Sequence, residues 1–140
     1  MVAPRSRPYE LLLADDDAEF RRTLRLVLER HVALCEAACG EEAVEIVRTR
    51  QIDLVLLDMN MRALSGLDTL RLVKSLRATL PCILITASFT DELRRTATLA
   101  DAFSVLKKPV SRRLLLKTVS GALASAYDDP SLADGFRPVA

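Results

Sequence analysis

The chain has 140 residues, of which 50% are hydrophobic and 28% are charged, and its net charge is +1. This length suits one domain that buries a core without disulfides or a structural metal, and the small net charge excludes a global field for nucleic acid or acidic membranes. The three cysteines lack metal-ligand spacing, and an odd number without a signal peptide indicates reduced thiols. We therefore expect a cytoplasmic protein that binds neither nucleic acid directly nor a membrane.

The first half of the chain predicts three strands and two helices. Residues 1–8 carry two prolines and two arginines, and we expect a flexible leader there. The elements predicted next are a strand over 9–14, a helix capped by Asp17, an edge strand over 32–37, a helix preceded by Gly40, and a strand over 53–57. The last of these is apolar throughout, which is typical of a central parallel strand.

The second half continues the alternation. After a loop over 59–66, the predicted elements are a helix with an apolar stripe from Leu67 to Leu76, a strand opened by Pro81, a helix starting at Thr90, a strand over 102–106, and a helix capped by Ser111. Asp128-Asp129-Pro130 ends that helix, so we expect one domain over 9–127 and a C-terminal tail over 128–140. This pattern predicts an α/β fold of the (βα)5 type, with a doubly wound, five-stranded parallel sheet.

Four of the short apolar runs end in residues that can handle phosphate or a divalent cation. Residues 11–14 precede Asp15-Asp16-Asp17, 54–57 precede Asp58, 82–85 precede Thr86, and 103–106 precede Lys107-Lys108-Pro109. In open α/β sheets, ligands bind outside the carboxyl ends of the strands. The fold therefore gathers carboxylates, a hydroxyl and an ammonium group at one edge of the sheet.

This set of side chains suits Mg²⁺-assisted phosphoryl transfer to an aspartate. Adjacent carboxylates at Asp15 and Asp16 repel each other unless a cation lies between them and Asp58, and Mg²⁺ prefers oxygen ligands. Asp58 is the candidate nucleophile, because a carboxylate that attacks a phosphoryl donor gives an acyl phosphate. Lys108 offers a point charge and Thr86 a hydroxyl donor for phosphoryl oxygens. Alone, the Asp-Asp pair and Thr86 are typical of turns and the Lys-Pro dipeptide is typical of the surface, and it is their joint occurrence that indicates this chemistry.

The same residues resemble the receiver domain of two-component response regulators. The resemblance covers about residues 10–126 and rests on four motifs, which are Leu11–Asp17, Asp53–Met61 with Ser65–Leu67, Ile83–Ala87, and Val105–Pro109. It implies a flavodoxin-like fold with the strand order 2-1-3-4-5. It also implies a switch in two-component signal transduction that accepts a phosphoryl group from a phosphohistidine donor, either a histidine kinase or a phosphotransfer protein.

The resemblance also assigns roles to individual residues. It implies that Asp58 is the phosphoacceptor, that Thr86 is the switch hydroxyl and that Lys108 is the phosphate-binding lysine. Asp16, Asp58 and the backbone carbonyl of Asn60 would contact Mg²⁺ directly, and Asp15 would act largely through water. We expect a phosphoacceptor that supplies its own phosphotransfer groups, including those for autodephosphorylation, rather than an enzyme. Its expected output is a protein contact, including a homodimer, through the fourth helix, fifth strand and fifth helix.

Two positions depart from the family pattern. Arg62 stands where proline is usual, and Val105 stands where tyrosine or phenylalanine is usual. Phe103 lies two residues earlier and, by strand alternation, on the same face, so whether it replaces the missing ring is open. The Lys108–Pro109 peptide bond is expected to be cis, because the chain must leave the last strand sharply while Lys108 points back towards Asp58.

Two other functions compete with this interpretation. A receiver-like scaffold that binds partners without phosphorylation is supported only by Arg62 and Val105. A Mg²⁺-dependent phosphatase of the haloacid dehalogenase type is disfavoured, because its nucleophile follows the first strand and Asp58 follows the third. Arg21, Arg22 and Arg25 are expected to form a solvated helix face, with a docking surface for a histidine kinase as the alternative. Whether the domain stands alone or belongs to a longer chain is open.

Overall fold

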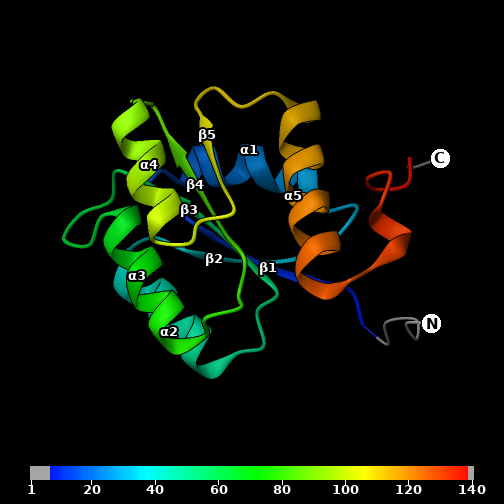
Figure 1. The fold of residues 1–140 in the computed structure, drawn as a ribbon, viewed down its shortest axis with the longest axis horizontal. Helices are drawn as coiled ribbons and strands as arrows, with labels where there is room; N and C mark the ends of the chain where they lie inside the picture. The colour runs from blue at the N-terminus through cyan, green and yellow to red at the C-terminus, as the bar shows by residue number, and fades with distance from the viewer. Residues whose placement is uncertain (1–6, 139–140) are drawn as a thin grey trace.

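The computed structural model describes residues 7–138 as five strands that alternate with five α-helices, followed by one 3₁₀ turn (Figure 1). The strands are β1 (Glu10–Ala14), β2 (Ala33–Ala37), β3 (Leu54–Asp58), β4 (Cys82–Thr86) and β5 (Ser104–Lys107). The helices are α1 (Ala18–Leu28), α2 (Gly40–Thr49), α3 (Gly66–Leu76), α4 (Asp91–Leu99) and α5 (Arg112–Tyr127), and the 3₁₀ turn η1 is Pro130–Leu132. Most of the predicted leader lies outside the described residues.

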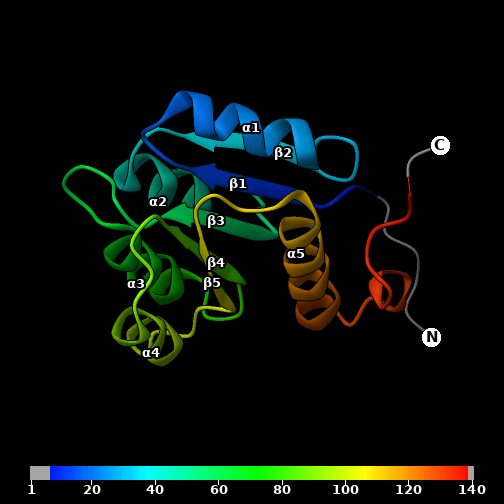
Figure 2. The ribbon, with the colours of Figure 1, turned by 90° about the horizontal axis from the view of Figure 1, so that it is seen from above.

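All strand pairs are parallel, and the strand order is β2-β1-β3-β4-β5. The predicted fold class and strand order are therefore confirmed. Every residue of β3 and β4 is buried, because helices cover both faces of the sheet. Figure 2 shows α1 and α5 on one side of the sheet and α2, α3 and α4 on the other.

Each face of the sheet has its own hydrophobic core. The first core joins Leu11, Leu13 and Leu56 to residues of α1 and α5 such as Leu24 and Val119. The second is formed by the alternate strand residues together with apolar side chains of α2, α3 and α4. The period of two along the strands thus sends successive side chains into different cores. No helix within residues 7–138 has the length and apolar character needed to cross a membrane.

Side-chain caps fix the starts of four helices. Three of the capping residues, Asp17, Thr90 and Ser111, are those that the sequence predicted. Asp17, Ser65, Thr90 and Ser111 each accept a hydrogen bond from a backbone N–H of the first turn. The prediction for α2 was wrong by one residue, because Gly40 is its first residue rather than the residue before it. A Cβ atom at Gly40 would overlap Thr69 Oγ1 of α3, so glycine permits the close contact of the two helices.

The described part of the expected tail packs against the domain. Asp128 has a left-handed backbone (φ 47°) and ends α5, and η1 follows directly. The Tyr9 hydroxyl donates a hydrogen bond to Asp129, and the ring of Phe136 stacks on His31 with 4.7 Å between the ring centroids. Leu132 and Phe136 also contact the core on the α1 and α5 side. The C-terminal segment therefore contacts the chain just before β1 and just after α1.

Candidate acidic phosphoryl-transfer site

The four strand ends meet at one edge of the sheet and bring the predicted residues together. Asp15, Asp16 and Asp58 each place a carboxylate oxygen within 4.8 Å of the other two. The Lys108 ammonium lies 3.0 Å from Asp15 Oδ2 and 3.0 Å from Asp58 Oδ1. Asp15 and Asp58 are buried, whereas Asp16 is exposed. One ammonium group, that of Lys108, therefore lies beside a cluster of three carboxylates at the end of the sheet.

Asp15 is held by contacts to nearly all of its polar groups. Its backbone N–H donates to the Ala37 carbonyl of β2 at 3.1 Å, and its Oδ1 accepts the Asp17 N–H at 2.8 Å. Its Oδ2 accepts from Lys108, and its backbone carbonyl accepts from the Arg21 guanidinium. The side chain is thus oriented by the turn that begins α1.

Asp58 is the last residue of β3, and the loop that follows folds back closely against it. The Gly66 N–H donates to the Met59 carbonyl at 2.8 Å. A Cβ atom on Gly66 would overlap the Asp58 carbonyl oxygen and lie 2.8 Å from Met59 Cα, so this position requires glycine. Asn60 and Arg62 are exposed in the loop, and Ala63 adopts a left-handed backbone with φ 62°.

Lys108 reaches the carboxylates from the residue after β5. Its N–H donates to the Thr86 carbonyl at 2.8 Å, and the peptide bond to Pro109 is cis, as predicted. The ammonium also lies 4.0 Å from the centroid of the Phe20 ring on α1. The sequence pattern could not predict this contact, because nothing in it shows that the chain after β5 returns to α1.

Thr86 is buried at the end of β4, and its Oγ1 accepts the Ser88 N–H at 3.0 Å. Val105 packs into the core on the α4 side of the sheet. Phe103 precedes β5 and is 45% exposed, and a Cβ atom on Gly121 of α5 would lie 4.0 Å from its Cζ. The Phe103 ring thus reaches Gly121 of α5, and Phe103 also lines a surface hollow together with Val105.

Burial and the crowding of charges change the pKa values of the two central groups. Burial raises the pKa of the Asp58 carboxyl, and the charges of Asp15 and Asp16 raise it further, while the hydrogen bond from Lys108 opposes them. Burial alone would lower the pKa of Lys108, but its hydrogen bonds to Asp58 and Asp15 outweigh this and raise it. The site thus favours the protonated form of Lys108 and disfavours the ionised form of Asp58.

The donor set fits a small, hard divalent cation. All three converging ligand atoms are carboxylate oxygens, and one ammonium group does not balance their charge. Mg²⁺ is bound in proteins by one or two carboxylates together with water and phosphate oxygens. The exposed Asp16 leaves one side of the cluster open to solvent, where such waters can remain.

The arginines of α1 do not form the solvated face that we expected. Arg21 Nε lies 2.8 Å from Glu36 Oε1, and Arg25 Nη2 lies 2.7 Å from Glu36 Oε2. The hydrogen bond from Arg25 lowers the pKa of the Glu36 carboxyl, and the hydrogen bond from Arg21 adds to this effect. Burial opposes both, but the pKa remains below its ordinary value. Only Arg22 is exposed as predicted. The pairing requires β2 to lie beside the start of α1, which the helical pattern alone does not show.

Comparison with known proteins agrees with this geometry. Residues 11–120 match the family described as the response regulator receiver domain. The transcriptional regulatory protein ResD of Bacillus subtilis (strain 168) is 34% identical over 118 residues, which are 84% of this chain and 49% of ResD. The nitrate/nitrite response regulator protein NarP of Escherichia coli (strain K12) is 34% identical over 88 residues, covering 61% of this chain and 41% of NarP. The chain spans less than half the length of these two relatives.

Solved structures share the fold. A response regulator receiver domain from Clostridium thermocellum superimposes with a TM-score of 0.80 at 26% identity, covering 85% of this chain and 97% of that chain. The chemotaxis protein CheY4 of Vibrio cholerae gives a TM-score of 0.78 at 24% identity, covering 83% and 99%. Given the match over most of its length, the four motifs and the shared fold, the chain belongs to the response regulator receiver domain family.

Proposed function

We propose that Asp58 accepts the phosphoryl group in this receiver domain, with Mg²⁺ held by Asp15, Asp16, Asp58 and the backbone carbonyl of Asn60. The observation that carries the proposal is the meeting of three carboxylates with Lys108, which lies 3.0 Å from both Asp15 and Asp58. The bound cation would supply the positive charge that lets a carboxylate approach an anionic donor. The proposed donor is a phosphohistidine on a histidine kinase or phosphotransfer protein, with which receiver domains interact.

The residues of the chain have separate roles in this proposal. A carboxylate oxygen of Asp58 attacks the phosphorus, the bond from phosphorus to the histidine nitrogen breaks, and that nitrogen keeps the electron pair. Lys108 exchanges one of its carboxylate contacts for a phosphoryl oxygen, and the Thr86 hydroxyl donates to another. Autodephosphorylation is the later attack of water on the same phosphorus, which returns the Asp58 carboxylate and releases phosphate.

Acetyl phosphate with Mg²⁺ tests this assignment directly. Intact mass should show one added phosphate on the wild-type protein and none on Asp58→Asn, because the amide is not a nucleophile of this kind. Omitting Mg²⁺ should abolish the addition to the wild type. A phosphate that persists on Asp58→Asn would identify another acceptor, and a wild type that stays unmodified would favour the phosphorylation-independent scaffold.

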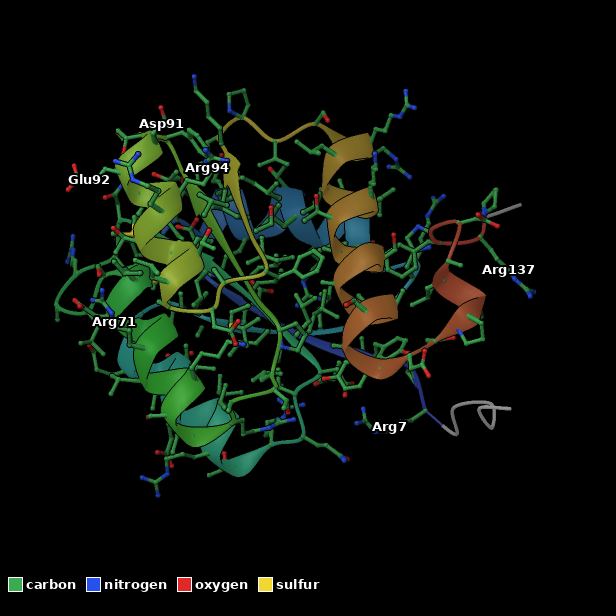
Figure 3. The ribbon with its side chains drawn as sticks, in the orientation of Figure 1. Arg7, Arg71, Asp91, Glu92, Arg94 and Arg137 are labelled. Carbon is green, nitrogen blue, oxygen red and sulfur yellow. The ribbon has the colours of Figure 1, made fainter. Side chains whose placement is uncertain are left out.

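We infer that α4, β5 and α5 carry the output, as a homodimer contact or a partner-binding face. Val105 of β5 and Arg94 of α4 line the same surface hollow, and Figure 3 shows Arg94 on α4 beside β5. Thr86 lies at the end of the neighbouring strand. Because Val105 is stiff at χ1 and has no ring to swing inward, we expect this surface to differ less between the two switch states than in relatives with tyrosine or phenylalanine.

Sedimentation with and without beryllofluoride, a phosphoryl mimic, measures this difference. We expect a weak to moderate change in self-association for the wild type and a larger change for Val105→Tyr, since a modification shifts an equilibrium only by its differential affinity for the two states. A large, equal dimerisation in both proteins would show that residue 105 does not limit the switch.

A further inference from the structure

The peptide group between Asp15 and Asp16 is held from outside the acidic cluster by Arg21. The guanidinium donates to the Asp15 carbonyl, and the Asp15 N–H on the other side donates to Ala37. Because a peptide unit is planar, fixing the Asp15 carbonyl also fixes the direction of the Asp16 N–H and the start of the Asp16 residue. Asp16 is exposed, and its carboxylate accepts no hydrogen bond from the residues that the structure describes.

Arg21 is itself fixed by a chain of charged contacts. Its Nε pairs with Glu36 Oε1 at 2.8 Å, and its side chain is only 16% exposed. The second oxygen of Glu36 accepts from Arg25 Nε at 2.9 Å and from Arg25 Nη2 at 2.7 Å. Glu36 lies on β2 opposite Leu13 of β1, two residues before Asp15. The sheet register therefore places the anion that aims Arg21 at the loop.

We propose that Arg21 is a positioning residue, which orients the Asp15–Asp16 peptide so that the Asp16 carboxylate faces the cation site. The inference rests on the proposed function in one respect, the role of Asp16 as a Mg²⁺ ligand. The described contacts of Arg21 reach the acidic residues only at the Asp15 carbonyl, so Arg21 acts through the backbone. Outer contacts of this kind orient the residues that bind a metal, and their loss typically weakens metal binding.

The direction in which Mg²⁺ affinity changes when Arg21 is removed distinguishes a positioning role from a simple charge effect. Arg21 is a positive charge near a cation site. If only its Coulomb repulsion of Mg²⁺ mattered, removing Arg21 would tighten Mg²⁺ binding. If Arg21 positions Asp16, its removal must weaken Mg²⁺ binding instead. The exposed Arg22 on the same helix provides a control with the same change of charge. A lysine at position 21 keeps the charge but cannot contact Asp15 and Glu36 with the forked geometry of a guanidinium.

Calorimetric titration of Mg²⁺ into wild type, Arg21→Ala, Arg21→Lys, Arg22→Ala and Asp16→Asn tests the proposal. We expect Arg21→Ala to bind on the order of tenfold more weakly than wild type, with Arg21→Lys between the two and Arg22→Ala equal to or slightly tighter than wild type. Asp16→Asn sets the value for a lost ligand. Equal or tighter binding by Arg21→Ala, compared with Arg22→Ala, would overturn the proposal.

A metal-free measurement separates failure of this inference from failure of the proposed function. In the absence of Mg²⁺, ¹⁵N relaxation should show a lower order parameter for the Asp16 amide in Arg21→Ala than in wild type, and no change in Arg22→Ala. An unchanged Asp16 amide in Arg21→Ala would reject the positioning role even if all variants bind Mg²⁺. If the wild type binds no Mg²⁺, the proposed metal site fails, and the relaxation data alone decide whether Arg21 orders the loop.

Discussion

Asp58 is a carboxyl group whose ionised form the metal-free fold disfavours, and this links the stability of the protein to pH. Burial and the neighbouring acids raise its pKa above the ordinary value. A carboxyl whose pKa is higher in the folded state contributes stability that is complete below the unfolded-state pKa and is lost as pH rises through the folded-state pKa. The acidic cluster is thus a source of strain that a cation would relieve.

We therefore expect Asp58→Asn to raise the free energy of unfolding at neutral pH in the presence of a chelator, because the amide carries no charge. The difference from wild type should shrink as the pH falls towards the ordinary carboxyl range, about pH 4. Urea unfolding at several pH values measures it, and saturating Mg²⁺ should reduce or reverse the difference by binding the wild type preferentially. A mutant less stable than wild type at neutral pH without Mg²⁺ would contradict the sign of the pKa shift.

At the scale of the elements, Gly66 at the start of α3 allows the loop after β3 to pack closely against Asp58. Gly66→Ala should destabilise the protein by roughly 1–3 kcal/mol, because the added Cβ overlaps the Asp58 carbonyl and forces the loop after β3 to move. The same displacement should lower phosphate uptake from acetyl phosphate. Gly121→Ala in α5 is the matched control. Its Cβ meets nothing closer than Phe103 Cζ at 4.0 Å, so the helix should gain about 0.5–1 kcal/mol.

Chemical denaturation of both variants and mass spectrometry of their phosphorylated forms give the comparison. Equal stabilities for Gly66→Ala and Gly121→Ala would show that the β3–α3 loop adapts without cost.

The sequence could predict those strands and helix caps that depend on local pattern. The apolar runs before Asp15, Asp58 and Thr86 are buried strands because their side chains enter two cores, and Asp17 and Ser111 are caps because their oxygens reach first-turn N–H groups. Contacts between distant segments could not be predicted in this way. The pairing of Arg21 with Glu36 depends on strand register, and the place of Phe103 depends on where β5 begins.

For the whole molecule, the C-terminal segment connects parts of the chain that are far apart in sequence. Phe136 stacks on His31, just beyond α1, with an angle of 21° between the ring planes, and η1 lies against α5. His31 is therefore a packing residue for this segment. Burial lowers its pKa, with the positive charges of Arg112 and Arg30 adding to the effect. No local pattern marks this contact, because both partners lie outside the periodic elements.

Phe136→Ala should lower the free energy of unfolding by on the order of 1–2 kcal/mol, from the lost apolar contact with the core and the lost ring pair. Arg137→Ala is the control, since Figure 3 shows Arg137 extending away from the helices and it is exposed. Thermal and urea unfolding of the two variants measure the difference, while phosphorylation of Asp58 should be unchanged in both because the segment lies far from the carboxyl ends of the strands. If Phe136→Ala were as stable as Arg137→Ala, the segment would not contribute to the core of the folded domain.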